Sequence, residues 1–327
     1  MEDLRARLRD IVAAMKFLSP TAFCFAGHTF QQADAGSAVT QLQEQLYHHC
    51  YCHLFRGVLE AEPFQPERQG SLLDELSAAN AGRSRWDTGW QIHHVSPSGW
   101  ICANKHGLNQ TFAPGEYATY GGPGLGPQPG ATVDVFFARE SRNMQEGFYF
   151  AFGETTADED DRFDLLRFYW HIHDDGAATL VRSATSALNR FQVPFRLKCL
   201  SDRRLFSRLD AAVIFVPRRY YQIASVLLAE IHARLAGLVG AEIPLFTKQL
   251  APGLGLAEDP GNGESFGMNR CRLLAEALAD DRVRALDSEH DCLEELDTVF
   301  RTHGLSVNAA YLNPGSVDQY EFPDHLD

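Results

Sequence analysis

Two pairs of polar residues lie inside otherwise apolar segments near the middle of this sequence. His171 and His173 continue one aromatic run, and Arg196 and Lys198 continue another. Because residues two apart on a strand project from the same face, each pair would present its side chains together. An imidazole beside two cations on neighbouring strands could hold an anion and supply an acid and a base. The spacing therefore predicts an anion site with acid–base chemistry.

The segments around these pairs predict strands connected by a helix and a turn. Aromatic and β-branched runs at 167–173, 194–198 and 211–216 are typical of strands, and the run between the first two has helical spacing. This stretch is also basic, because there are eleven Lys or Arg and five Asp or Glu between Arg162 and Arg219. We therefore expect a confined anion site here.

The remaining patterns predict an α+β fold. Helical spacing dominates the front of the chain, with helices expected at 37–56 and 71–80, and short strands broken by Gly and Pro begin at Gly89. The expected architecture is a helical N-terminal part packed on a mixed, largely antiparallel sheet with flanking helices. The expected regions are a helical N-terminal region (1–85), an α+β domain (86–310) and an acidic tail (311–327), or one continuous domain.

Composition argues against several classes of partner. The 327 residues include 29 Lys or Arg and 43 Asp or Glu, a net charge of −14 at pH 7. Nucleic acids and anionic membranes favour a basic surface, so we expect neither as a partner. No apolar run reaches spanning length, the first residues lack the apolar core of a secretory signal, and seven scattered cysteines are typical of reduced thiols. These features predict a cytoplasmic location.

Short blocks spread over most of residues 40–280 resemble the HopA effector-like family. The blocks are Leu76-Ser77-Ala78-Ala79-Asn80, Gly89-Trp90, Pro114-Gly115-Glu116-Tyr117, Phe148-Tyr149-Phe150-Ala151-Phe152-Gly153, Phe168-Tyr169-Trp170-His171, Pro194-Phe195-Arg196-Leu197-Lys198-Cys199 and Gly255-Leu256-Ala257-Glu258-Asp259-Pro260. Besides secreted effectors, that family includes bacterial proteins of class V lanthipeptide and thioamitide pathways. Those proteins are similar to the OspF and SpvC phosphothreonine lyases, so the resemblance implies a lyase-like core.

The resemblance also implies a reaction and its partners. The reaction would be β-elimination of phosphate from phosphoserine or phosphothreonine in a ribosomal precursor peptide with a leader, which leaves dehydroalanine or dehydrobutyrine. A separate peptide kinase would supply the phosphate, because nothing in this chain resembles the nucleotide loop or catalytic loop of a kinase. Such an elimination needs a base, an acid and cations around the phosphate, and it requires neither a metal nor a cofactor.

Roles for individual residues follow from the same resemblance. By similarity to the Lys-x-His strand motif of the lyases, His171 would be the general acid, and Tyr169 stands where that motif has lysine. The position of the lyases' catalytic lysine falls on Arg196, with Lys198 one pleat further along. A guanidinium stays protonated whereas a crowded, partly desolvated lysine can lose its proton, so Lys198 is the favoured base. The predicted phosphate ligands are Arg196, Tyr169, Arg204, Lys248 and Arg270.

Two other functions remain open at this point. Tyr169 and Arg196 depart from the lyase motifs, so the chain could be an inactive HopA-like scaffold that binds the precursor peptide or its kinase. It could also be a secreted effector that acts on host phosphoproteins. An active lyase should bring His171, Lys198 and several arginines together in one cleft, whereas a scaffold should leave them dispersed.

Overall fold

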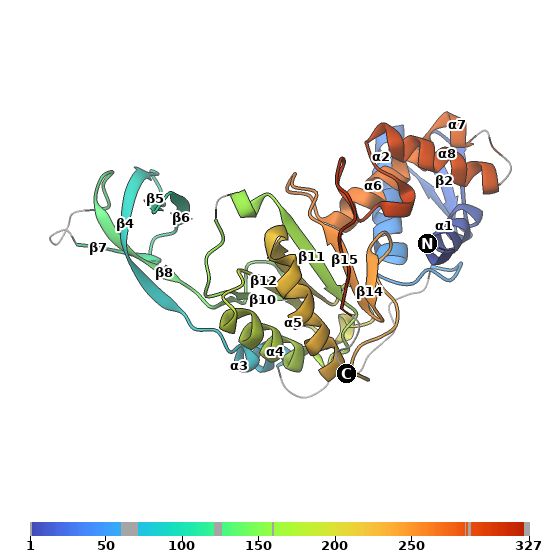
Figure 1. Cartoon of the computed structure of the whole chain (residues 1–327). Coiled ribbons are helices and arrows are strands. Elements are labelled where there is room, and N and C mark those ends of the chain that lie inside the picture. Colours follow the sequence, from blue (N-terminus) through green and yellow to red (C-terminus); the bar gives the residue numbers. More distant parts are fainter. Residues whose placement is uncertain are drawn as a thin grey trace.

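The computed structural model describes residues 2–59, 71–120, 126–158, 160–284, 286 and 289–323. The chain forms a central sheet with an N-terminal lobe on one side and a projecting β-sheet arm on the other (Figure 1). This architecture confirms the α+β fold class. Every helix in the described ranges is too short or too polar to span a lipid bilayer.

The central sheet has seven strands in the order β14-β15-β11-β13-β12-β10-β9, and all the neighbouring pairs are antiparallel. The strands are β9 (Glu140–Ser141), β10 (Phe148–Phe152), β11 (Leu165–Trp170), β12 (Arg196–Leu200), β13 (Ala212–Pro217), β14 (Lys248–Ala251) and β15 (Leu254–Glu258). The three strands expected between residues 167 and 216 are therefore present. The intervening helix is α4 (Ala177–Arg190).

One face of this sheet is fully covered by helices. Leu166, Phe168 and Trp170 alternate along β11 and are inaccessible to solvent. They pack in one core with α3 (Leu72–Ala79), α4 and α5 (Tyr221–Arg234), which lie together beneath the sheet in Figure 1. Helix α3 begins where the sequence predicted, because the Ser71 side chain accepts a hydrogen bond from the amide of Asp74. The alternate residues of the sheet project from the opposite face.

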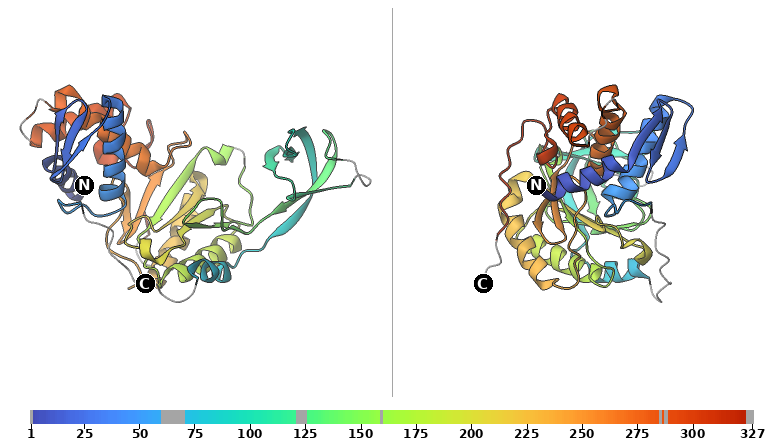
Figure 2. Two further views of the ribbon diagram at one scale, coloured as in Figure 1. Left: turned by 180° about the vertical axis from the view of Figure 1, so that it is seen from behind. Right: turned by 90° about the vertical axis from the view of Figure 1, so that its right-hand side faces the viewer.

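An N-terminal lobe covers part of that opposite face. It combines α1 (Glu2–Ala13), α2 (Ala35–Leu46) and a π-helical turn, η1 (Tyr47–Tyr51), with three helices from the other end of the chain, α6 (Phe266–Ala279), α7 (Asp281–Arg284) and α8 (Glu289–Thr302). Figures 1 and 2 show these two ends side by side. Tyr51 and Phe266 share a core with Tyr169, Val213 and Phe215 of the sheet. The lobe therefore lies over β11 and β13.

The N-terminal lobe also contains a small sheet that the helical interpretation of residues 1–85 did not include. Its strands, β1 (Met15–Ser19), β2 (Ala22–Phe25) and β3 (His28–Gln31), form two successive antiparallel hairpins. The rings of Phe23 and Phe30 stack on one face with centroids 4.9 Å apart. Phe23 and Phe25 alternate with the small residues Ala22 and Cys24, and this period-two pattern is the signal of the sheet.

The arm is a second antiparallel sheet with a core of its own. Its strands, β4 (Arg85–Val95), β5 (Ile101–Lys105), β6 (Leu108–Phe112), β7 (Tyr117–Thr119) and β8 (Thr132–Phe137), lie in the order β6-β5-β4-β8-β7. Trp90, Ile92, Phe112, Val133 and Val135 are buried between them. Figure 1 and the left panel of Figure 2 show the arm reaching away from the central sheet, opposite the N-terminal lobe.

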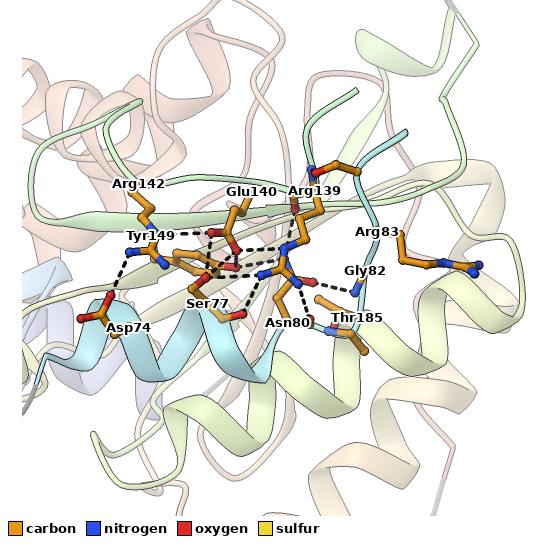
Figure 3. Close-up of polar contacts among 12 residues, drawn as sticks. Asp74, Ser77, Asn80, Gly82, Arg83, Arg139, Glu140, Arg142, Tyr149 and Thr185 are labelled. Carbon is orange, nitrogen blue, oxygen red and sulfur yellow. Dashed lines mark hydrogen bonds and ion pairs between the residues drawn. The ribbon is translucent and has the colours of Figure 1, made fainter. Parts of the chain in front are cut away.

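A polar network joins the two roots of the arm to the central sheet (Figure 3). Glu140 accepts hydrogen bonds from Ser77 at 2.7 Å and from the Tyr149 hydroxyl at 2.9 Å. Arg139 donates to the carbonyls of Ser77 and Asn80, and the Asn80 amide donates to the Arg139 carbonyl. Because Asn80 precedes the arm and Arg139 follows it, these bonds fix both chain segments at one place.

The C-terminal segment is anchored on the central sheet through a buried carboxylate. Glu258, which is inaccessible to solvent, accepts hydrogen bonds from the Tyr320 hydroxyl and the backbone N–H of Asn313, both at 2.6 Å. Arg218 forms an ion pair with it at 3.1 Å. Of the predicted acidic tail, residues 324–327 lie outside the described residues. The domain boundaries at 85 and 310 stay predictions.

Candidate anion site on the open face of the central sheet

Arg196 and Lys198 project from the same face of β12, as the period-two pattern predicted. The strand register aligns Arg196 with Phe215 and Arg167, and Lys198 with Val213 and Tyr169. These rows belong to the face that the helices α3, α4 and α5 leave uncovered. The N-terminal lobe buries Tyr169 and Val213 but reaches β12 only in part, since Arg196 is exposed and Lys198 is half-buried. Both cations therefore lie at the open side of the sheet.

Lys198 is held close to an aromatic ring and among other cations. Its Nζ lies 3.7 Å from the centroid of the Phe148 ring. Partial burial and the positive charges of Arg208, Arg167 and Arg196 lower the pKa of Lys198 to about 8, although the negative charge of Asp210 opposes them. Among the described residues, no carboxylate forms an ion pair with the Lys198 side chain. The amine is therefore neutral in an appreciable fraction of molecules near neutral pH.

Arg196 is a second cation without an acidic partner. Its Cζ lies 4.3 Å from the centroid of Phe215, and the Cζ of Arg167 lies 5.3 Å from the same centroid. Partial desolvation of the guanidinium against the sheet and the charge of Arg167 lower the pKa of Arg196 and the charge of Asp259 opposes them, yet a guanidinium remains charged. Within the described ranges no carboxylate pairs with it, whereas Arg167 is bound to Asp259 at 2.6 Å. Arg196 therefore has hydrogen-bond donors available for an external anion.

A second ion pair, between Arg208 and Asp210, lies close enough to Lys198 for both charges to affect its pKa. The Arg208 guanidinium donates two hydrogen bonds of 2.8 Å to the Asp210 carboxylate, and it also reaches the Tyr47 hydroxyl at 3.3 Å. Tyr47 opens the π-helical turn η1, a rare conformation that occurs often at functional sites. Two ion pairs, Arg167–Asp259 and Arg208–Asp210, thus flank Lys198 and Arg196. The two flanked residues supply the uncompensated charge.

His171 is not brought to Lys198. It follows the end of β11, where its amide donates to the Gly253 carbonyl and its carbonyl accepts from the Gly240 amide. Its ring packs against Gly240 so closely that a Cβ there would collide with it. Strand β13 lies between β11, which His171 follows, and β12, and burial together with the charge of His173 lowers the pKa of His171. The ring is therefore mostly neutral at pH 7, and its assignment as the general acid stays a prediction.

The other predicted phosphate ligands lie apart from the Arg196–Lys198 pair. Tyr169 is 3% exposed, beneath Tyr51, and Arg270 is 2% exposed, with its guanidinium bound to the carbonyls of Ala310 and Leu312. Arg204 forms an ion pair with Asp202, and Lys248 forms one with Asp318. The structure thus places Arg196 and Lys198 together and uses the other predicted side chains in internal contacts.

Sequence reasoning missed several residues of this site. Arg167 was recoverable, because it lies two positions before Tyr169 and therefore on the same face of its strand. Phe148 and Phe215, which lie beside Lys198 and Arg196, belong to neighbouring strands, and only the register reveals them. The Arg208–Asp210 pair lies in a turn, where neither periodicity nor a motif marked it. The pairing of strands that are distant in the sequence therefore determines which side chains meet at this site.

The chemistry that this face supports is proton abstraction beside a bound anion. A neutral lysine can accept a proton, and a neighbouring guanidinium can hold two oxygens of a phosphate or carboxylate. Partial burial and the nearby arginines favour the neutral amine, whereas the face of the Phe148 ring attracts the ammonium form. Among the described residues, no cluster of three or more His, Cys, Asp or Glu side chains has the arrangement of a metal site.

Comparison with known proteins agrees with this architecture. The fold is that of an α+β protein built on an antiparallel sheet, and the HopA1 effector protein family model matches residues 139–312, more than half of the chain. The chain belongs to the HopA1 effector protein family. The matched segment contains every strand of the central sheet and both Arg196 and Lys198.

One solved structure shows the same fold over nearly the whole length. An effector protein from Pseudomonas syringae pv. tomato strain DC3000 is similar at 14% identity with a TM-score of 0.51, covering 95% of this chain and 96% of that one. An effector protein from Pseudomonas syringae pv. syringae strain 61 is similar at 15% identity with a TM-score of 0.46, covering 85% and 96%. Among curated proteins, no match is found.

Proposed function

We propose that this chain is a phosphoserine/phosphothreonine lyase that eliminates phosphate from a phosphorylated ribosomal precursor peptide. The product would contain dehydroalanine or dehydrobutyrine, as in lanthipeptide and thioamitide pathways. The observation that carries the proposal is Lys198, whose pKa is lowered to about 8 beside the unpaired guanidinium of Arg196. The resemblance of the Arg196–Lys198 segment to the lyases' catalytic lysine segment supports the same assignment.

In the proposed reaction, neutral Lys198 removes the proton from Cα of the phosphorylated residue. The electron pair of the Cα–H bond forms the Cα=Cβ double bond, and the Cβ–O bond breaks with its electron pair leaving on the phosphate oxygen. Arg196 compensates the charge on the departing phosphate through bidentate hydrogen bonds. No net oxidation or reduction occurs, and no water is consumed.

The departing oxygen also needs a proton when the phosphate is a dianion. His171 is the acid that the lyase resemblance assigns, and its distance from β12 makes that role depend on a rearrangement at the end of β11. The ammonium of Lys198, formed in the first step, is an alternative donor, because it arises beside the leaving group. Comparing His171→Ala with Lys198→Ala distinguishes these routes.

The proposed partners follow from the reaction. A separate kinase would phosphorylate the precursor peptide, and the leader of that peptide would bring it to this cytoplasmic lyase. Neither nucleic acid nor a membrane has a role in the proposal. The alternating basic and acidic residues around the site suit a peptide with one phosphate better than a polyanion, because both flanking arginines are already neutralised by Asp259 and Asp210.

The decisive experiment uses the full chain with a short phosphothreonine peptide and with a co-encoded precursor phosphorylated by its kinase. Mass spectrometry would detect loss of phosphoric acid. We expect elimination that is abolished in Lys198→Met and retained in Lys16→Met, which removes an exposed lysine on β1 of the N-terminal lobe. Unfolding curves of both variants would show that the fold survives.

Each outcome has a clear meaning for the proposal. Elimination that survives in Lys198→Met would remove Lys198 as the base. Elimination lost in Lys198→Ala but retained in His171→Ala would favour Lys198 as both base and acid. If neither the short peptide nor the phosphorylated precursor loses phosphoric acid, the proposed lyase function is refuted.

A scaffold is the second candidate, and the separation of His171 from Lys198 favours it. The Arg196–Lys198 pair would then bind the phosphorylated peptide without converting it. Binding measured by fluorescence anisotropy, with tight capture of the phosphorylated peptide and no loss of phosphoric acid, would support the scaffold. Equal affinity for the unphosphorylated peptide would contradict it.

A further inference from the structure

A cavity of about 510 Å³ lies beside Arg196 and Arg167 on the central sheet. Its volume falls within the range of about 300–1,000 Å³ that small-molecule sites occupy and exceeds what a single phosphoryl group needs. Strands β11, β12 and β13 form its floor, and loops that follow β10 and β15 form its rim. Its lining includes Phe163, Leu165, Arg167, Phe195, Arg196 and Phe215.

The walls of this cavity are mostly apolar, although its floor is charged. Phe195, Phe215 and Leu165 contribute carbon surface, and Phe163 stands at the rim with 73% of its surface exposed. The Arg167–Asp259 pair is internally neutral, so Arg196 is the cation there without an acidic partner among the described residues. A ligand of matching chemistry has one anionic group and, beside it, a large apolar group.

The distance from Lys198 limits where such an apolar group can lie on a peptide. Arg196 and Lys198 are two residues apart on one strand, which corresponds to roughly 6.6 Å because a strand rises about 3.3 Å per residue. An extended peptide covers the same distance in about two residues. A phosphorylated residue at Lys198 would therefore place a residue one or two positions away at the mouth of the cavity.

We propose that the cavity beside Arg196 binds a large apolar side chain located within two positions of the phosphorylated residue of the substrate peptide. This inference rests on the proposed lyase function and specifies the substrates on which it acts. The phosphate lies between Lys198 and Arg196, and the neighbouring apolar side chain covers Phe163 and contacts Phe215. Burial of the exposed Phe163 ring provides part of the binding free energy.

The test compares phosphothreonine peptides that differ at one position. Each peptide has a Gly/Ser background and carries Leu, Phe or Ser at position −2, −1, +1 or +2 relative to phosphothreonine. The measured quantity is kcat/KM for loss of phosphoric acid by the full chain. We expect one position at which Leu or Phe exceeds Ser by about ten-fold, the effect of burying much of one apolar side chain.

Variants assign this preference to the cavity. In Phe163→Ser the ratio of the apolar to the Ser peptide should fall to below about three-fold, because the rim loses its carbon surface. The matched control is Leu18→Ser, which changes an apolar residue on β1 of the N-terminal lobe that is 56% exposed. The control should keep the wild-type ratio. Both side chains are largely exposed, so the fold should persist, as thermal unfolding would verify.

The outcomes separate this inference from the function on which it rests. Elimination with equal kcat/KM for all the peptides, or a preference unchanged in Phe163→Ser, would overturn the inference and leave the lyase standing. Elimination from none of the peptides, with the phosphorylated full-length precursor also unchanged, would overturn both. A positional preference that disappears in Phe163→Ser and persists in Leu18→Ser would support the inference.

Discussion

Lys198 should titrate near pH 8, and replacing Asp210 should lower its pKa further. The ordinary pKa is 10.5, and partial burial with three nearby arginines lowers it to about 8. The Asp210 carboxylate opposes this effect, so Asp210→Asn removes a negative charge that stabilises the ammonium form. The same substitution leaves Arg208 without its ion-pair partner, which adds positive potential at Lys198.

The shift has a large effect on the amount of reactive amine. With a pKa of about 8, about one molecule in eleven has a neutral Lys198 at pH 7, which is about 300-fold more than at a pKa of 10.5. The neutral fraction, and with it any reaction that needs the free amine, should rise about ten-fold between pH 7 and pH 9 and then level off. In Asp210→Asn this rise should occur at lower pH.

Competitive acetylation measures this pKa without assuming any activity. The protein is labelled with trace acetic anhydride between pH 6 and 11, and mass spectrometry gives the reactivity of Lys198 relative to the exposed Lys16. The matched control is Asp202→Asn, which breaks the surface ion pair with Arg204. A midpoint near 10.5 in the wild-type protein, or an upward shift in Asp210→Asn, would refute the reasoning.

Further expectations concern stability and anion binding. Because the folded pKa of Lys198 lies below its unfolded value of 10.5, this side chain binds more protons in the unfolded chain between pH 8 and 10.5. The free energy of unfolding of the wild-type protein, measured relative to that of Lys198→Met, should therefore rise with pH over this range. Arg270→Ala should lower the free energy of unfolding in urea by about 2–4 kcal/mol, because it leaves the buried carbonyls of Ala310 and Leu312 unpaired. Arg204→Ala should lower the same free energy by less than about 1 kcal/mol, because its ion pair lies at the surface. Hydrogen bonds that outweigh burial lower the pKa of Glu140, so the stability that its carboxylate contributes should be present at neutral pH and lost as pH falls below 4.5. Because Glu140 also binds Ser77 at the root of the arm, Glu140→Ala should accelerate amide hydrogen exchange at both roots of the arm. Arg196→Gln should weaken binding of a phosphothreonine peptide by about ten-fold or more, measured by anisotropy.

Specific results would contradict these expectations. A difference in free energy of unfolding between the wild-type protein and Lys198→Met that does not change between pH 8 and 10.5 would mean that Lys198 titrates normally. Equal losses of unfolding free energy in Arg270→Ala and Arg204→Ala would contradict the expected difference between a buried and a surface arginine. Unchanged exchange at the arm roots in Glu140→Ala would assign the arm's attachment to other contacts, and unchanged peptide affinity in Arg196→Gln would exclude Arg196 as a phosphate ligand.

Local patterns in the sequence predicted the central elements well. Strands at β11, β12 and β13, the cap at Ser71 and the helix between β11 and β12 depend on short-range periodicity and local hydrogen bonds, which the sequence displays directly. The expected helix at 37–56 instead ends as α2 at Leu46 and continues only through the π-helical turn to Tyr51. At that ending Tyr51 packs against Tyr169, and such a long-range contact is not visible in a local pattern.

The sequence by itself determined that Arg196 and Lys198 share one face, because the alternation of side chains along a strand is local. It also determined the α+β class and the family resemblance, which depend on short patterns and blocks. Only the tertiary structure decided that His171 lies away from Lys198 and that Arg270 binds the Ala310 and Leu312 carbonyls. Those outcomes depend on which distant segments meet, and strand order and lobe packing set these long-range contacts.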